Sequence, residues 1–377
     1  MNANTVQAGL EGVTVAETRL SDIDGEAGEL VIAGFPVEEL ARNATYEETV
    51  FLLLEDRLPS AGELSRFRAS LASRRGLCAE AHAVVRRAAE DDEPAMDALR
   101  MGLAAASLDA DTDTSRETAE RVVAVIPTIV AAYWRYRQGE APVAPDPELG
   151  HAANYLAMLT GDEPVDHAVR GLETYLNTVV DHGLNASTFT ARTVVSTDSD
   201  LLSAATAAVG ALKGPLHGGA PGPVLEMLRA VHDSGDPEGY VRETLDAGER
   251  LMGFGHRVYR VRDPRAEVLS TAARRFYETA GETEFYDTVA EFESVALDLL
   301  ADHKPDRRLA TNVEFYTAAL LHGVGIPRAV FTPTFAVARA GGWMAHGLEQ
   351  LEDNRLVRPV SRYTGAKDRS WTPVAER

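Results

Sequence analysis

The sequence contains a single cysteine, very few lysines and no long hydrophobic run. Because Cys78 is alone, the chain can form neither an intrachain disulfide nor a thiolate metal cluster, which is typical of a protein from a reducing cytoplasm. Its longest apolar stretch, 122–134, is shorter than the roughly 20 residues that cross a bilayer. The amino-terminal residues lack the basic start and apolar core of a signal peptide. We therefore expect a cytoplasmic protein that does not contact membranes.

Positive charge is also scarce. The chain carries 37 basic and 58 acidic residues, for a net charge of −21, and its lysines are Lys213, Lys304 and Lys367. Such a surface repels nucleic acid and anionic lipid, so we expect neither as a partner. A GC-rich genome would explain the preference for arginine. Adaptation to molar salt, which shortens the Debye length to about 3 Å, would also explain the excess of carboxylates, and we favour a halophilic protein.

The pattern of apolar residues predicts a mainly α-helical protein. At 377 residues the chain is longer than a single core usually grows, so two domains are expected. Strand signals are confined to 18–35, where Asp-Gly and Gly-Glu pairs separate short apolar pieces and predict a small β-hairpin or meander. Most of the remaining chain has helical periodicity. We therefore expect a mainly α fold with one small β element near its start.

Some helix boundaries can be predicted from local signals. Thr45, with Glu48 three residues later, forms a capping box ahead of an apolar helix. Further helices are predicted at 116–138 and 238–252, among others. Pro127 lies inside the first of these two and should kink or divide that helix, because proline removes a backbone donor and clashes with the preceding turn.

A histidine lies among glycines in the segment KGPLHGGA, 213–220. A helix of small residues ends there at a Gly-Pro pair, and two glycines after His217 leave room for a ligand to approach the imidazole. An imidazole can gain or lose a proton near neutral pH. For this segment alone, a structural histidine in a helical corner remains the simpler interpretation.

Two further segments place a histidine beside glycine after an apolar helical stretch, His182 in DHGLN and His256 in GFGHRV. The second lacks both the third glycine and the preceding strand of a dinucleotide-binding motif. The chain contains neither GxSxG nor HExxH, which argues against an α/β-hydrolase and a zincin. The histidines are far apart in the sequence, and most of their neighbours are glycines and arginines rather than carboxylates, so we expect no metal site.

Arginines gather around His256, at Arg250, Arg257, Arg260, Arg262 and Arg265. They either neutralise nearby carboxylates at a solvated helix end or form an anion site, since arginine binds carboxylate and phosphate in a bidentate manner. Arg339 and Arg358 lie in apolar contexts farther on. A buried arginine requires a partner, and a small dicarboxylate would serve.

The three histidine segments, together with NVEFY at 312–316, RAGGWMAH at 339–346 and EDNRLVRP at 352–359, resemble the citrate synthase family. The resemblance covers almost the whole chain and is strongest to the short archaeal and bacterial type, which includes 2-methylcitrate synthases. With the acidic composition, it points to a haloarchaeal protein. It implies a homodimer with an almost wholly helical fold. A large domain, 1–218 and 335–377, would carry a small domain, 219–334, that closes over oxaloacetate before acetyl-CoA binds.

The resemblance also implies roles for individual residues. His217 would hydrogen-bond the thioester carbonyl of acetyl-CoA, His256 would polarise the ketone of oxaloacetate, and Glu314 would be the catalytic base. The oxaloacetate ligands would be His182, His256, Arg265, Arg339 and, reaching into the partner subunit's site, Arg358. The CoA contacts would be Arg250, Gly255 and Arg260. The CoA thioester is a substrate here, so no separate cofactor and no metal are implied.

The implied activity is that of an acyltransferase of the tricarboxylic acid cycle, which converts acetyl-CoA, oxaloacetate and water into citrate and CoA. A 2-methylcitrate synthase that uses propionyl-CoA is the nearest alternative, because one methylene in a pocket is worth only about 1 to 3 kcal/mol. A homologue that binds oxaloacetate or CoA with impaired catalysis is another.

One departure from the family pattern affects the base itself. The family has aspartate at the position of Glu314, and a proline at the position of Thr311. Glutamate has nearly the same pKa but is one methylene longer, and moving a base by about 1 Å can cost on the order of a hundredfold in rate. Three interpretations follow: the backbone has shifted to compensate, the pocket suits a different acyl-CoA, or the chain has lost synthase activity.

The acidic composition predicts a dependence on salt, because surface carboxylates repel one another less when they are screened. Thermal unfolding temperature and turnover, measured from about 0.1 M to about 3 M KCl, should both rise with salt concentration. Full stability and activity in low-salt buffer would contradict the halophile hypothesis.

Overall fold

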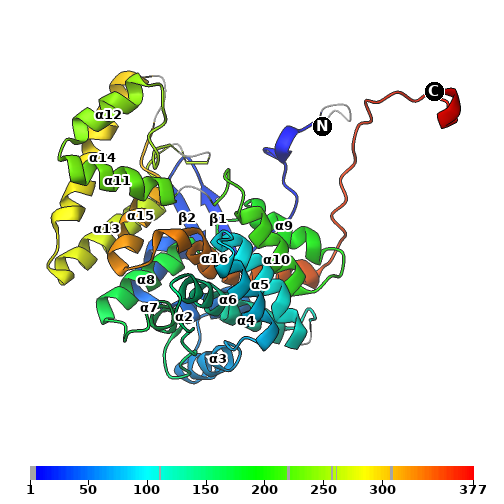
Figure 1. Ribbon diagram of the computed structural model, residues 1–377, viewed down its shortest axis with the longest axis horizontal. Helices are drawn as coiled ribbons and strands as arrows, with labels where there is room; N and C mark the ends of the chain where they lie inside the picture. The colour runs from blue at the N-terminus through cyan, green and yellow to red at the C-terminus, as the bar shows by residue number, and fades with distance from the viewer. Residues whose placement is uncertain (1–5, 110–111, 219–220, 256–257, 260, 306–308) are drawn as a thin grey trace.

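The computed structural model describes residues 6–109, 112–218, 221–255, 258–259, 261–305 and 309–377, and it has the expected mainly helical architecture (Figure 1). The helices are α1 Val37–Asn43, α2 Tyr46–Glu55, α3 Ala61–Ser73, α4 Ala79–Glu90, α5 Ala95–Ala105, α6 Arg116–Arg137, α7 His151–Thr160, α8 Asp166–Val179, α9 Ala186–Val195, α10 Leu201–Leu212, α11 Pro221–Ser234, α12 Pro237–Asp246, α13 Pro264–Ala280, α14 Glu284–His303, α15 Val313–Val324 and α16 Phe331–Glu352. None of the helices in these ranges is long and apolar enough to cross a membrane.

The small sheet confirms the predicted amino-terminal β element. Its antiparallel strands are β1 Ser21–Asp24, β2 Glu29–Ile32 and β3 Phe35–Pro36, in the order β1-β2-β3. The turn between β1 and β2 is closed by Asp24, whose carboxylate accepts the backbone N–H groups of Glu26 and Ala27 at 2.9 and 2.8 Å. Gly28 then takes a left-handed conformation, with φ of 74°, which glycine adopts without strain.

The capping box at Thr45 is confirmed. The Thr45 side chain accepts from the Glu48 N–H, and the Glu48 carboxylate accepts from the Thr45 N–H at 2.8 Å, so α2 begins where predicted. Helix α12 is shorter than predicted and ends at Asp246 rather than near residue 252. Gly248, with φ of 73°, ends it, and the segment that follows leads into the loop of the third histidine.

Pro127 does not divide its helix, contrary to one of the two expected outcomes. Helix α6 is one element from Arg116 to Arg137, with Pro127 buried in its middle. It packs against α4, α5, α7 and α16, so tertiary burial of an apolar helix outweighs the local cost of the missing backbone hydrogen bond.

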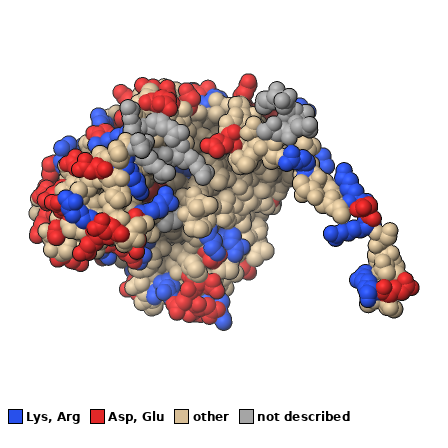
Figure 2. Space-filling view, turned by 90° about the horizontal axis from the view of Figure 1, so that it is seen from above, with Lys and Arg blue, Asp and Glu red and all other residues tan. Residues whose placement is uncertain are grey.

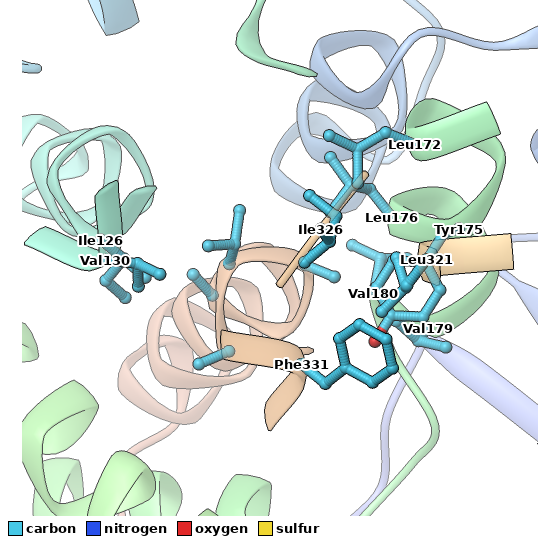
Figure 3. Packing of buried hydrophobic residues seen from close by; sticks show 14 of the residues in the cluster. Ile126, Val130, Leu172, Tyr175, Leu176, Val179, Val180, Leu321, Ile326 and Phe331 are labelled. Carbon is cyan, nitrogen blue, oxygen red and sulfur yellow. The ribbon is translucent and has the colours of Figure 1, made fainter. Parts of the chain in front are cut away.

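Helix α16 runs through the centre of the fold and packs against α2, α6, α8, α9 and α10 (Figures 1 and 3). Glycines on α16 allow this close approach. A Cβ atom added at Gly342 would lie 2.4 Å from the carbonyl oxygen of Val180, and one at Gly341 would lie 2.8 Å from a methyl group of Val50. The backbone after α8 therefore lies directly against the central helix, which brings residues 180–182 to its surface.

The charged surface and the chain ends have distinct positions. In Figure 2, Asp and Glu side chains gather over the end of the molecule that α11–α14 form. Beyond α16, residues 354–377 leave the body as an extended tail, close to the amino-terminal segment (Figure 1). The tail exposes apolar side chains, with Val360 92% and Trp371 79% accessible.

A buried histidine at the start of α7 makes the fold sensitive to acid. The His151 N–H donates to a carboxylate oxygen of Glu47 at 2.8 Å, and its ring lies 4.7 Å from the Tyr46 ring, between centroids. Both ring nitrogens are buried without a hydrogen-bond partner in the described part of the chain. Burial, with the nearby charge of Arg75, lowers the pKa of His151 to about 3.

Because the folded pKa lies below the ordinary value of 6.5, the unfolded chain binds the extra proton more readily, and the stabilisation present above pH 6.5 is lost as pH falls toward 3. When the pH falls from 7.5 to 5, the free energy of unfolding should decrease in both proteins. We expect this decrease to be about 2 kcal/mol smaller in His151→Phe than in the unmodified chain. Urea unfolding at both pH values checks this. As a control, replacement of the exposed His303 by Gln should leave the difference unchanged.

Candidate active site

The central helix presents Arg339, Trp343 and His346 on one buried face, and each contacts a different part of the site. Arg339 is only 1% exposed. Its Nε donates to the carbonyl oxygen of Val179 at 2.7 Å, and its guanidinium carbon lies 4.6 Å from the centre of the Phe335 ring. Burial lowers the pKa of Arg339 to about 10, so the group is still a cation at neutral pH.

Trp343 holds the serine that orients His217. The indole Nε1 donates to Ser187 Oγ at 3.0 Å, and Ser187 Oγ lies 2.8 Å from His217 Nε2. The Ser187 backbone N–H also points at Nε2, at 3.3 Å. An amide can only donate, so Nε2 is an acceptor and the neutral ring carries its proton on Nδ1.

Burial, with a contribution from the charge of Arg339, lowers the pKa of His217 to about 4. The half-buried imidazole is therefore neutral at pH 7 and can donate a hydrogen bond from Nδ1. Lys213 anchors this corner, because its Nζ lies 2.6 and 2.7 Å from the carboxylate oxygens of Asp97 on α5. The corner is thus fixed at its first residue by the ion pair of Lys213 with Asp97, and at His217 by the contact with Ser187.

His182 lies in the turn between α8 and α9. Its Nε2 is 3.1 Å from the hydroxyl of Tyr259, which precedes α13 in the chain. The carboxylate of the preceding Asp181 is fully buried and lies 3.2 Å from His346 Nε2. Burial alone would raise the pKa of Asp181, but its contact with His346 and the charge of Arg339 lower it. The turn is therefore fixed by an ionised side chain beside the histidine.

Arg265 is the second residue of α13 and is paired with Asp263, which caps the same helix. Asp263 accepts from Arg265 Nε at 3.1 Å and from Nη2 at 2.8 Å, and both residues are buried. The guanidinium carbon lies 5.8 Å from the centre of the Tyr259 ring. This bidentate pair holds the arginine in one orientation while keeping its charge inside the site.

Glu314 lies in the first turn of α15, where the side chain of Asn312 caps the helix by accepting from the Glu314 N–H at 3.0 Å. Its carboxylate has no hydrogen-bond partner within the described ranges. Burial raises the pKa of Glu314 to about 7, against the opposing effects of Arg265 and Arg339. At neutral pH the group is therefore both substantially ionised and appreciably basic.

The loop with the third histidine is paired with the start of α15. The Gly255 N–H donates to the Ala310 carbonyl at 2.7 Å, and the Asn312 N–H donates to the Gly253 carbonyl at 2.9 Å. The Asn312 side chain also donates to the Gly255 carbonyl at 2.9 Å. Two predicted site residues, His256 and Arg260, lie outside the described residues.

The charges of Arg265, Glu314 and Arg339 act on one another, and the charge of Arg339 also reaches His217. His182 joins this group through Tyr259, which it contacts and over whose ring Arg265 lies. The structure does not bring Arg358 there within one subunit. Arg358 is exposed on the tail, in an open cleft of about 830 Å³ between the amino-terminal segment and the end of α16. Arg250 is exposed in the segment after α12, and Gly255 has a φ of 84°. Within the described ranges, no cluster of three or more His, Cys, Asp or Glu side chains could hold a metal ion.

Sequence reasoning missed the side chains that hold the expected ones in place: Asp181, Ser187, Tyr259, Asp263, Trp343 and His346. Trp343 and His346 belong to the quoted segment 339–346. They follow Arg339 by four and seven residues, and this spacing was an available signal for one helix face. Ser187 and Tyr259 carried no such signal, since each contacts a residue far away in the chain.

Comparison with known proteins identifies one family over nearly the whole chain. The family model for the citrate synthase C-terminal domain matches residues 9–360. The chain is 47% identical to the citrate synthase of Haloferax volcanii over 99% of both chains, in agreement with the predicted halophilic character. It is 34% identical to the 2-methylcitrate synthase of Shewanella oneidensis over 98% of both chains.

A solved structure is similar over the whole fold. The ternary complex of carboxymethyl coenzyme A and oxaloacetate with citrate synthase from Thermoplasma acidophilum gives a TM-score of 0.89 at 28% identity, and covers 99% of this chain and 100% of that one. Sequence and structure thus agree along nearly the full length, and the chain belongs to the citrate synthase family.

Proposed function

We propose that the protein condenses acetyl-CoA with oxaloacetate and hydrolyses the resulting citryl-CoA to citrate and CoA. The observation that carries this proposal is a neutral imidazole donor, His217, and a carboxyl with a pKa of about 7, Glu314, which both lie in the field of the buried Arg339. Enolate chemistry requires this combination of a base for a weakly acidic C–H and a donor for the charge that develops on oxygen.

In the proposed first step, the Glu314 carboxylate removes a proton from the acetyl methyl group. The electrons of the broken C–H bond pass to the thioester oxygen, where His217 Nδ1–H donates a hydrogen bond. The enolate carbon then attacks the ketone of oxaloacetate, which His256 polarises. The electrons of the C=O π bond pass to the ketone oxygen, which takes up a proton and becomes the hydroxyl group of citryl-CoA. Water finally cleaves the thioester, which releases CoA. The CoA thioester is itself the substrate, so the proposed reaction uses no separate cofactor.

The proposed oxaloacetate site combines Arg265, Arg339 and His182 with His256. The two buried guanidinium groups provide positive charge for two carboxylates, and Asp263 and the Val179 carbonyl fix their directions. Holding one reactant rigidly beside the other converts a bimolecular step into an effectively unimolecular one. The Thermoplasma acidophilum complex, with oxaloacetate and a coenzyme A derivative bound to a similar fold, supports this choice of ligands.

We further propose that Arg250, Gly255 and Arg260 contact CoA, and that the protein is a cytoplasmic homodimer. In the dimer Arg358 would complete the partner subunit's site. The extended tail with its exposed apolar side chains supports this arrangement, since such a segment needs a surface to cover it. The division into a large domain, 1–218 and 335–377, and a small domain, 219–334, is part of the same proposal.

The first test compares acetyl-CoA with propionyl-CoA, each with oxaloacetate, in molar KCl. We expect free-thiol release with a higher kcat/KM for acetyl-CoA. A preference for propionyl-CoA would instead support 2-methylcitrate synthesis, the activity named for the Shewanella oneidensis relative. If neither thioester is cleaved while calorimetry detects oxaloacetate binding, the protein is a binding homologue.

A second test concerns the length of the base. Glu314→Gln cannot accept the proton, so kcat should fall at least about a hundredfold. Glu314→Asp shortens the reach by one methylene and should lower kcat by on the order of a hundredfold if the backbone has adapted to glutamate. A faster Glu314→Asp variant would show that glutamate is poorly placed in an uncompensated site.

The third test is the pH profile of kcat/KM for acetyl-CoA. Because the base must be ionised, the value should rise tenfold per unit below pH 7 and level off above it, with a midpoint near the pKa of about 7. Glu173, beside Arg170 on α8, provides a control, since burial also raises its pKa to about 7. Glu173→Gln should leave the midpoint unchanged. A shifted midpoint in this variant would show that the observed ionisation belongs to Glu173 and not to Glu314.

A further inference from the structure

We propose that the β1–β2 hairpin is a positioning element that holds two segments next to the proposed oxaloacetate ligands at once, residues 181–183 and residues 258, 259, 261 and 262. The inference rests on the proposed function, which places His182 and Arg265 at oxaloacetate. The two segments lie far apart in the chain, one after α8 and the other before α13. Figure 1 shows β1 and β2 between the helices that follow each segment, α9 and α13.

Ser21 on β1 fixes the turn on both sides of His182. Its hydroxyl donates to Asp181 Oδ2 at 2.5 Å and accepts from the Gly183 N–H at 2.8 Å. One side chain therefore satisfies a buried carboxylate before the histidine and a backbone donor after it. Loss of this hydroxyl leaves both groups short of a partner, and buried polar groups without partners are costly.

Ile23, on the same strand, packs against this turn. Gly183 has a φ of 55°, and a Cβ added there would lie 3.3 Å from the Cδ1 atom of Ile23. Strand β1 thus contacts the turn through the hydrogen-bonded side chain of Ser21 and the apolar side chain of Ile23. These residues are two positions apart and therefore lie on the same face of the strand. The direction of the His182 backbone is set by this face.

The tip of the hairpin touches the second segment. A Cβ added at Gly25 would lie 2.5 Å from the carbonyl oxygen of Val258, and one at Gly28 would lie 2.6 Å from Val261 Cγ2. The first distance involves backbone, which cannot rotate out of the way. Glycine at position 25 therefore permits a backbone approach that any other residue would prevent.

The second segment also closes the arrangement on its inner side. Tyr259 follows Val258, and its hydroxyl lies 3.1 Å from His182 Nε2. Val258 thus contacts the hairpin tip, and the adjacent Tyr259 contacts His182. Ser21 of the same hairpin holds the turn that contains His182. A displacement at the tip is therefore transmitted to Tyr259 and to the turn of His182, the residues that lie against Arg265 and His182.

The test uses Gly25→Ala, Ser21→Ala and Ser21→Thr in the full-length protein in molar KCl. The φ of Gly25 is not left-handed, so alanine meets no intrinsic backbone strain there, and the clash with Val258 is the main effect. We expect Gly25→Ala to lower kcat/KM by about a hundredfold. Ser21→Ala should raise KM for oxaloacetate about tenfold with a smaller change in kcat, and Ser21→Thr, which keeps the hydroxyl, should restore it.

Matched controls separate positioning from general destabilisation. Gly76 has open space around its Cβ position and no left-handed φ, and Ser65 is exposed on α3. Gly76→Ala and Ser65→Ala should keep the KM for oxaloacetate. Thermal unfolding should not distinguish the hairpin variants from these controls by more than a few degrees. Wild-type kinetics for both Gly25→Ala and Ser21→Ala would overturn the proposal.

Hydrogen exchange gives a result that does not depend on the reaction. The Gly183 amide should exchange faster in Ser21→Ala, and the amides of residues 258, 259, 261 and 262 should exchange faster in Gly25→Ala, whether or not the unmodified protein condenses the proposed substrates. Inactivity of the unmodified protein with faster exchange in the variants would reject the proposed function alone. Unchanged exchange in both variants would reject the hairpin's role.

Discussion

The buried guanidinium of Arg339 is the constraint on which the rest of the site depends. A cation inside the core of a protein is tolerated only where hydrogen bonds and opposite charges compensate its lost hydration. Here the Val179 carbonyl, the Phe335 ring and the nearby carboxylates of Asp181 and Glu314 supply that compensation. Glycine on α16 allows the segment with Asp181 to approach, because a Cβ added at Gly342 would lie 2.4 Å from the Val180 carbonyl oxygen and 2.8 Å from Asp181 Oδ1.

The same charge divides the roles of the two proton-handling side chains. Positive potential and burial both favour a neutral His217, so its pKa falls. For Glu314 the two effects oppose each other: burial favours the neutral acid, whereas Arg265 and Arg339 favour the carboxylate. A buried carboxyl without those arginines would be a poor source of ionised base, and an exposed one would be too weak a base. Arg265 and Arg339 are therefore proposed to bind the carboxylates of the substrate, and they also keep the pKa of Glu314 low enough for it to be ionised.

Local signals predicted much of the fold. The capping box at Thr45, the turn after Asp24 and the glycine-rich corner at His217 each depend on neighbouring residues, and each was found where expected. Other features were not predictable locally. Helix α6 stays continuous at Pro127 because it is buried by packing. Helix α9 was not predicted, because it is rich in threonine, which lowers helix propensity, and it begins at the Asn185 cap. The partners of the histidines, such as Ser187 and Tyr259, lie far from them in the chain. Contacts between residues so far apart cannot be predicted from the local pattern of a single sequence.

The exposed tail changes what counts as the folding unit. Residues 354–377 expose Val360, Tyr363, Trp371 and Val374 and form little regular structure of their own. Apolar surface of this kind is stabilised only by the surface that comes to cover it. If a second subunit supplies that surface, the free energy of folding includes a term in protein concentration, so dilution alone can destabilise the enzyme even where salt and pH are constant.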